Sequence, residues 1–361
     1  MENSKASNRP IKRSDRVAAE VVANDLRYAD KPYDFVRFTN QPPTLRSPIG
    51  HDRYQSDLLH GRISLKLHVL KGLHNSTGVT VLGEDLGMPR LNLVKSMVQG
   101  EDRHLRIQGS SFKGCIRAIY EAISNSKLGI NSIDKVSVPN NFKPANEIKS
   151  LCPASHVFGA QDWQGLLEFH DAICESTYEE SVIYIPSLWG PQSRCDNYYQ
   201  MVGGRKLQKG RKFYHSMTMF ADKHLDETTN IQIAAMMSVF STHVNFKNIS
   251  CAELGCLLIS LGQEPKYPLL PKLGLGKSIG LGSIRIEPIE FQIVSDRQTM
   301  KKRYEHYNLS TDCLDLGQSQ ILINNCIASS HDDGLVDLAS LQQLANILTN
   351  KPHKQPPEGV Y

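Results

Sequence analysis

Several segments of the chain alternate apolar and polar residues, the pattern of a half-buried strand. Residues 62–69, RISLKLHV, place an apolar side chain at every second position, and this period of two predicts a β-strand. The same alternation follows a glycine-rich segment and runs to Val294. Further strands are expected at residues 165–172, at 181–187 and within 231–246.

Between these strands the apolar period changes to three and four residues, which predicts helices. The first lies in residues 109–127, GSSFKGCIRAIYEAISNSK, where Ser110 or Ser111 can cap the first turn. Its apolar positions include Ile116, Ile119, Tyr120 and Ile123.

The second predicted helix begins with a capping box. Ser250 and Glu253 have the S-x-x-E spacing, leucines recur on one face over the next two turns, and Gly262 ends the helix. A third helix is expected at Leu338–Leu348. Strands and helices therefore follow one another as β, α, β, β, α, β, which predicts an α+β fold.

Composition narrows the class of protein. The apolar runs of the 361 residues are far shorter than a membrane span requires. The N-terminal segment MENSKASNRPIKRSD also lacks the apolar core of a secretory signal. We therefore expect a cytoplasmic protein without a membrane partner. Its eight cysteines form no C-x-x-C pair, which favours reduced thiols over a disulfide framework or a zinc site.

Charge is unevenly distributed along the chain. The net charge is +4, but the first 286 residues carry +8 and the remainder carries −4. A basic body with an acidic tail suits a polyanionic partner. A solvated surface of uneven charge explains the same numbers equally well.

Gly109, Ser110 and Ser111 form a candidate anion site at the start of the first predicted helix. A helix N-terminus presents backbone N–H groups to an anion, and Lys113 and Arg117 follow one turn apart on the same face. A plain capped helix is the alternative.

A second candidate site combines basic and aromatic residues within a segment that breaks the strand pattern. Basic side chains bind phosphates and rings stack on bases, so this mixture suits single-stranded nucleic acid. A basic hairpin without a ligand is the alternative. The residues concerned are Arg194, Arg205, Lys206, Lys209, Arg211, Lys212, Phe213, Tyr214 and His215.

A glycine-rich loop, KLGLGKSIGLG, precedes the last predicted strand. Such dense glycines let the backbone approach a ligand or another chain segment closely. GKS within it is not a phosphate loop, because Pro271 replaces the required glycine and a strand follows. The loop's candidate binding residues are Lys272, Gly274, Gly276, Lys277, Gly280 and Gly282.

Taken in order, these motifs resemble the RAMP superfamily of CRISPR-associated proteins, and most closely the RNA-binding backbone subunits of type III effector complexes. The similar segments are PYDFV, RIQGSSFKGCIR, CPASHVFGAQDWQGLLEFHDA, GRKFYHS, NFKNISCAELGCLLISLG and KLGLGKSIGLGSIRI. They span roughly residues 32–294. CPASHVFG has Ser155 where several relatives have a further cysteine, so the resemblance does not extend to a metal role for Cys152.

The resemblance implies a ferredoxin-like core, of the type found in RNA-recognition motifs, over residues 61–294. In that core 61–71 is the first strand, 111–126 and 250–261 are the helices, 230–245 adds sheet and 282–294 is the last strand. Residues 188–212 would form a thumb-like hairpin over the guide RNA. Residues 1–60 would be an extended N-terminal arm, lying on another surface such as a neighbouring subunit, and 295–361 a C-terminal extension.

The resemblance also implies a function. The chain would bind the guide (crRNA) through its backbone and shape, position complementary target RNA and contact other CRISPR effector subunits in antiviral defence. The helix start at 109–113 and Arg117 would contact the guide, the glycine-rich loop would pack beside it, and no cofactor would be needed for this binding.

Two enzymatic alternatives remain open. Some relatives cleave target RNA with an acid in the loop before the GSS helix, and Asp85 is the candidate here, with Mg²⁺ or another divalent cation at the scissile phosphate. At the family's acidic position this chain has Arg90 and Asn92, so Asp85 requires an insertion in that loop. A stand-alone ribonuclease that processes guide precursors, with a histidine as general base, is the further alternative.

Overall fold

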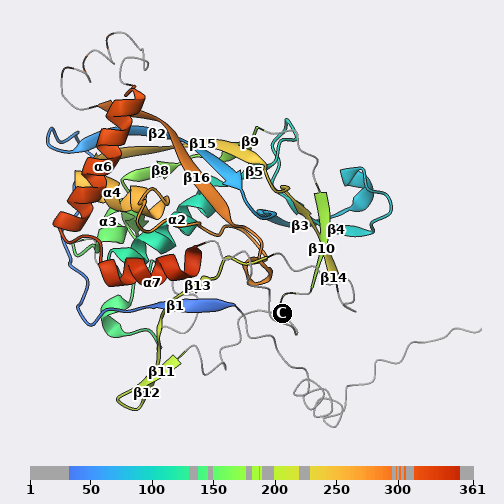
Figure 1. The fold of residues 1–361 in the computed structure, drawn as a ribbon, viewed down its shortest axis with the longest axis horizontal. Helices are drawn as coiled ribbons and strands as arrows, with labels where there is room; N and C mark the ends of the chain where they lie inside the picture. The colour runs from blue at the N-terminus through green and yellow to red at the C-terminus, as the bar shows by residue number, and fades with distance from the viewer. Residues whose placement is uncertain are drawn as a thin grey trace, which may run out of the picture.

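The computed structural model describes most of the chain between Pro32 and Thr349. The described residues are 32–129, 137–144, 149–175, 181–186, 188, 199–218, 228–294, 298, 301, 305 and 313–349. They form an α+β fold with five sheets (Figure 1).

A six-stranded sheet forms the centre of the protein. Its strands stand in the order β16, β2, β15, β9, β5, and β8 pairs with the same edge of β15 as β9 does. The long strands β2, β15 and β16 are antiparallel to their neighbours. The strands are β2 (Leu59–Val69), β5 (Arg106–Ile107), β8 (Leu167–Phe169), β9 (Ala172–Cys174), β15 (Val239–Ile249) and β16 (Ile284–Val294).

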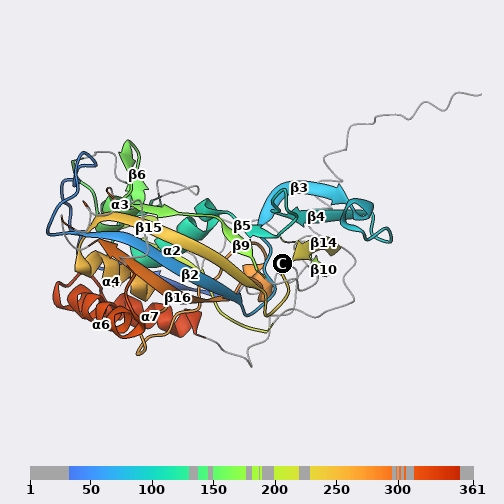
Figure 2. The same ribbon diagram turned by 90° about the horizontal axis from the view of Figure 1, so that it is seen from above.

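Helices cover one face of this sheet and leave the other face open (Figures 1 and 2). α4 packs against α2 and α6, and α2 also contacts α3 and α7. The helices are α2 (Gly109–Ile123), α3 (Pro153–Phe158), α4 (Cys251–Ser260), α6 (Leu316–Asp332) and α7 (Leu338–Leu348).

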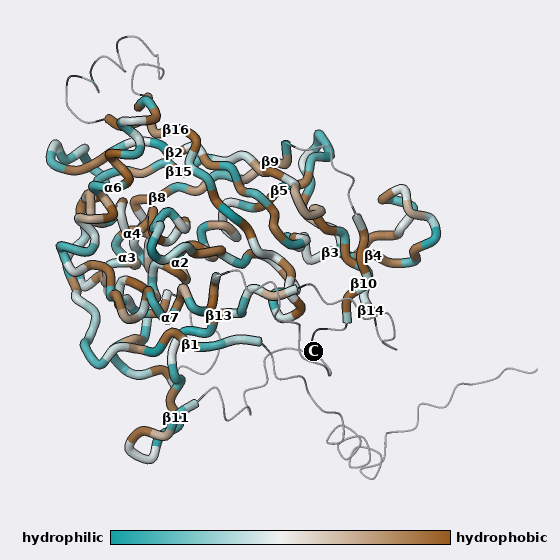
Figure 3. The backbone as a smooth tube through the Cα atoms, viewed as in Figure 1, coloured by the Kyte–Doolittle hydropathy of each residue, from teal (hydrophilic) through white to brown (hydrophobic). Residues whose placement is uncertain are grey.

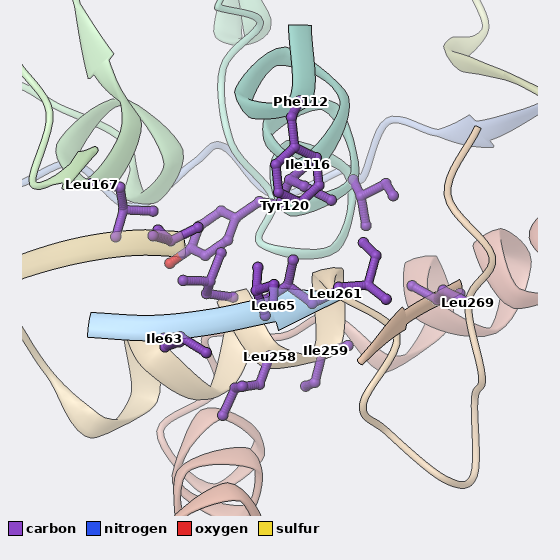
Figure 4. Close-up of a cluster of buried hydrophobic side chains, with 14 of the residues drawn as sticks. Ile63, Leu65, Phe112, Ile116, Tyr120, Leu167, Leu258, Ile259, Leu261 and Leu269 are labelled. Carbon is purple, nitrogen blue, oxygen red and sulfur yellow. The ribbon is translucent and has the colours of Figure 1, made fainter. Parts of the chain in front are cut away.

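The core lies between the sheet and α2 and α4. Alternate residues of β2, from Ile63 to Val69, are buried, as period-two patterning requires. Phe112, Ile116 and Tyr120 of α2 point toward them (Figure 4). Each such buried side chain stabilises the fold by roughly 1.5–3 kcal/mol relative to exposure.

A smaller sheet beside the core holds the glycine-rich loop in place. Its strands stand in the order β10, β14, β4, β3, and hydrophobic stretches run through both sheets (Figure 3). Ile279 and Leu281 of the loop are buried against Ile185, Ile231 and Ile233 of this sheet. The strands are β3 (Ser76–Leu82), β4 (Leu93–Met97), β10 (Ser181–Pro186) and β14 (Thr228–Ile233).

Part of the expected N-terminal arm belongs to the body of the protein. β1 (Tyr33–Arg37) pairs antiparallel with β13 (Gly210–Tyr214), and Val36 is fully buried. Arg46 forms an ion pair with Glu253 of α4. Residues 32–60 of the arm therefore pack on their own chain. Residues 1–31 lie outside the described residues.

Two short two-stranded sheets complete the described structure. β6 (Gly159–Ala160) pairs with β7 (Trp163–Gln164), and β11 (Tyr199–Val202) pairs with β12 (Arg205–Gln208). Three 3₁₀ helices span Gly83–Leu86, Asn140–Phe142 and Lys277–Ile279. Within the part of the chain that is described, no helix has the length and apolar character needed to cross a membrane.

The periodicity located the main elements and missed some boundaries. The capping box of Ser250 and Glu253 is present at α4, and α7 spans the predicted 338–348. The stretch 230–245, expected to add further sheet to the core, is divided between β14 and β15, which belong to different sheets. The turn that separates them contains Met237 at φ 74°, a backbone conformation that no apolar pattern reports.

Candidate nucleic-acid interface

The start of α2 is held by Asp171, an acid for which the sequence predicted no role. The helix begins at Gly109 and its N-cap, Gln108, makes no side-chain capping bond, so the predicted serine cap is wrong. Instead, Asp171 Oδ1 accepts a hydrogen bond from the Gly109 N–H at 2.7 Å. A Cβ at position 109 would lie 2.3 Å from the carbonyl oxygen of Phe169, which explains the glycine. Ser110 is exposed and Ser111 half-buried beside it.

The two cations that follow on α2 are both engaged inside the protein. Lys113 Nζ donates to the carbonyl oxygen of Leu167 at 2.9 Å, and burial together with Arg117 lowers the pKa of Lys113. Arg117 Nε donates to Glu121 Oε1 at 2.7 Å, an ion pair one helical turn long. Arg117 is therefore neutralised by an ion pair, whereas Lys113 is bonded to a neutral carbonyl oxygen.

Three lysines from distant parts of the sequence meet at one cavity, hereafter the lysine pocket. Its volume is about 350 Å³, and its walls are α2, β13 and the glycine-rich loop. Residues from all three predicted sites line it: Ser111, Lys212, Phe213, Tyr214, Lys272, Gly274 and Lys277. Gly114, Cys115 and Ala118 of α2 also line it, and the Cys115 thiol donates to the carbonyl oxygen of Lys272 at 3.3 Å.

Two lysines of this pocket, Lys272 and Lys277, donate hydrogen bonds to backbone carbonyl oxygens. Lys272 Nζ donates to the carbonyl oxygens of His215 and Lys277 at 2.9 and 3.2 Å, and Lys277 Nζ donates to that of Gly274 at 2.7 Å. Lys212 Nζ lies 5.1 and 5.0 Å from the ring centroids of Tyr33 and Tyr214. The carbonyl oxygens do not neutralise the ammonium groups of Lys272 and Lys277, so positive charge is concentrated here.

The pKa values of the pocket's lysines reflect their burial and the nearby positive charges. Burial, with help from Lys277 and Lys71, lowers the pKa of Lys272 to about 7. Burial also lowers the pKa of Lys277 and raises that of the Cys115 thiol to about 11. An anion entering the pocket would reverse the shifts of the lysines, because an opposite charge favours the protonated ammonium.

The glycines of the loop allow its backbone to pack closely against other backbone segments. Gly274 and Gly282 have φ angles of 83° and 82°, and a Cβ at either would lie 2.2 and 2.0 Å from the carbonyl oxygens of His74 and Leu273. The loop also has Gly276 and Gly280 in the left-handed region. These glycines bring Lys272 and Lys277 close to β13 and α2.

With this geometry in view, comparison with known families is informative. The family model described as the RAMP superfamily matches residues 66–285, more than half of the chain. The chain belongs to the RAMP superfamily. No curated protein matches it.

Among solved structures this RAMP protein is similar to a chain of a type III-B Cmr-beta complex bound to cognate target RNA. The sequence identity is 13% and the TM-score 0.36, over 66% of this chain and 62% of that one. The alignment thus spans less than two thirds of the Cmr chain.

The basic and aromatic segment of this RAMP protein divides into two structures, and the hairpin expected over residues 188–212 ends before β13. β11 and β12 form a short hairpin whose turn, Gly203 and Gly204, has positive φ at both residues. Arg205 and Lys206 are exposed on it, and Lys206 Nζ lies 5.0 Å from the Tyr199 ring centroid. Arg194 lies outside the described residues.

The remainder of that segment is β13 and its flanks, which belong to the body. Arg211 is buried, donates to the carbonyl oxygen of Ser126, and lies 5.1 and 5.7 Å from the ring centroids of Phe38 and Phe142. Burial lowers its pKa to about 10. Arg211 therefore supports the fold, while half-buried Lys209 lies between the hairpin and the strand.

Asp85 is exposed and lies in the 3₁₀ helix that connects β3 to β4. No three or more His, Cys, Asp or Glu side chains among the described residues gather in a way that could hold a metal ion. Asp85 has an acidic neighbour, Glu84, in the same 3₁₀ helix. Its catalytic role remains a prediction from the resemblance.

Proposed function

We propose that this chain is a guide-RNA-binding subunit of a type III CRISPR effector. The observation that carries the proposal is the lysine pocket, in which residues from the GSS helix, β13 and the glycine-rich loop face one cavity. A RAMP protein with three lysines around such a cavity is suited to the phosphates of a guide, because phosphate contacts do not depend on base sequence.

The arrangement of the core supports the same proposal. We infer a βαββαβ ferredoxin-like core, because β16, β2, β15 and β8 lie in that order and α2 and α4 cover one face of the sheet. We infer that β11 and β12 act as the thumb-like element of this core, since the hairpin carries exposed cations and lies apart from the sheet (Figure 1). Target RNA and other effector subunits are the partners that this assignment entails.

Binding of unrelated guides by the purified protein tests the proposal. We expect similar affinity for single-stranded RNAs of different sequence, and a loss in the Lys277→Gln variant. Lys266→Gln is the matched control, because Lys266 lies over the ring of Tyr267, outside the pocket. Equal affinities of wild type and the Lys277 variant, or strong dependence on sequence, would contradict guide binding at this pocket.

A further inference from the structure

A second, larger cavity lies at the opposite ends of the long strands. It has a volume of about 990 Å³ and is bounded by the first turn of α2, the start of β2, the end of β15 and residues 51–54. Leu166, Leu167, Phe246 and Val294 give it an apolar floor. The volume suits one or more nucleotides, since ligand sites commonly measure about 300–1,000 Å³.

Cations outnumber acids around this cavity. Arg62, Lys113 and Lys247 line it with one acid, Glu168. Asn245 bridges Arg62 and Glu168. Arg62 Nε donates to Asn245 Oδ1 at 2.9 Å, and Asn245 Nδ2 donates to Glu168 Oε2 at 3.1 Å. The carboxylate of Glu168 is therefore engaged by Asn245, and His170 Nε2 lies 3.7 Å from Glu168 Oε2.

The two lysines make hydrogen bonds to neutral groups. Lys113 donates to the carbonyl oxygen of Leu167, and Lys247 Nζ donates to that of His51 at 2.8 Å. Because an ammonium has three donors, each lysine can bind a phosphate oxygen while keeping its carbonyl bond. The hydroxyl of Ser110, exposed at the start of α2, adds a further donor on the same side.

An aromatic ring stands at the mouth of the cavity. Tyr54 is 47% exposed, although its ring is large and apolar. Its position is fixed by the ring of His60, edge-on at 4.8 Å, and by Lys247 Nζ, 5.3 Å from its centroid. A fixed, exposed ring beside basic groups is the combination by which proteins stack an unpaired base while binding its phosphate.

We propose that this cavity holds an unpaired nucleotide of single-stranded RNA. The base stacks on Tyr54, and its phosphate lies between Lys113, Lys247 and Ser110. This assignment rests on the proposed function, because the nucleotide belongs to an RNA that also crosses the lysine pocket. α2 lies between the two cavities, with Ser110 and Lys113 lining one and Ser111 and Cys115 the other.

The Tyr54→Ala variant tests this site, since its exposed side chain can be removed without opening the core. Affinity is measured for an unpaired oligouridine and for a fully paired RNA duplex of the same length. Loss of one stacking contact weakens binding of the unpaired RNA by about fivefold to a hundredfold. Binding of the duplex stays unchanged, because paired bases cannot stack on the ring. Lys247→Gln weakens binding of both.

The Lys277→Gln variant separates failure of this site from failure of the proposed function. If Tyr54→Ala binds oligouridine as tightly as the wild type while Lys277→Gln does not, the nucleotide site is wrong and guide binding stands. If Lys277→Gln has no effect while Tyr54→Ala weakens binding, RNA binds at the larger cavity and the lysine pocket is wrong. Binding of an acidic peptide that Tyr54→Ala and Lys247→Gln both weaken, with RNA binding unchanged in the two variants, would assign the cavity to a protein partner and overturn the proposal.

Discussion

Lys272 Nζ donates to the carbonyl oxygen of His215 at 2.9 Å, which joins the glycine-rich loop to the end of β13. The two residues are 57 positions apart in the sequence. The bond holds a lysine with a pKa of about 7 at the lysine pocket. An ammonium whose protonation changes near neutral pH makes the charge of the pocket dependent on pH.

RNA affinity should therefore fall as the pH rises through 7. A bound phosphate favours protonated Lys272, so binding above pH 7 takes up a proton and weakens by up to about tenfold per pH unit. Measurements between pH 6 and pH 9 at constant ionic strength check this slope. Lys272→Arg keeps its charge over that range and should flatten the profile; a variant with the wild-type slope would show that another group titrates.

Arg205 and Arg211 of the basic segment should have different effects when replaced. Replacing Arg205 together with Lys206 by alanine removes two exposed cations, so the salt dependence of RNA binding should decrease by up to about 1.4 in logarithmic slope. The free energy of unfolding should change by less than about 0.5 kcal/mol. RNA titrations at several salt concentrations and urea unfolding measure both quantities.

Arg211→Met should lower the free energy of unfolding instead. The substitution leaves the carbonyl oxygen of Ser126 without this donor, at a cost of about 1–3 kcal/mol. Affinity of the folded variant for RNA should stay at the wild-type value. A stable variant with weakened RNA binding would place Arg211 in the interface and contradict its structural role.

Two glycines of α2 should respond in opposite directions to alanine. Gly109→Ala forces a Cβ against the backbone carbonyl of Phe169, so we expect a loss of about 1–3 kcal/mol in the free energy of unfolding. Gly114→Ala meets no atom within 4 Å and should stabilise the helix by about 0.5–1 kcal/mol. Thermal or urea unfolding of the two variants checks the sign of each change, and a stable Gly109→Ala would contradict the close contact with Phe169.

Cleavage of target RNA provides the test for Asp85. If this acid holds a divalent cation at the scissile phosphate, Asp85→Ala should abolish one cleavage position in the assembled effector and leave guide binding intact. Removal of Mg²⁺ by a chelator should have the same effect. Glu84→Ala is the matched control, because Glu84 is the exposed neighbour in the same 3₁₀ helix. Unchanged cleavage in the Asp85 variant would leave the subunit a structural role.

The sequence predicted elements whose signals are local. The alternation of β2 and the capping box of α4 each depend on neighbouring residues, and both were found as expected. Asp171 was missed as the acceptor for Gly109, since the two are 62 residues apart and meet only in the folded chain. Arg211 illustrates the same limit: the sequence shows a cation in a basic segment, and burial between Phe38 and Phe142 makes it structural.

For the lysine pocket, the sequence did identify the residues that meet in the folded chain. Lys212, Lys272 and Lys277 were each identified from local composition, and their convergence on α2 follows from β13 and the glycine-rich loop packing together. The larger cavity was not predicted, because Tyr54 lies outside every recognised motif and Lys247, within the segment NFKNISCAELGCLLISLG, was assigned no role. A period-two strand such as β15 places Lys247 on a face of the sheet but does not say what that face meets.

The most direct test of guide binding is recovery of RNA with the protein from its own host. The tagged chain is purified at moderate salt, and the bound nucleic acid is separated on a denaturing gel and sequenced. We predict discrete RNAs that share one constant end and differ in the remainder, together with other effector subunits. A protein that emerges without nucleic acid and without partners would contradict the account.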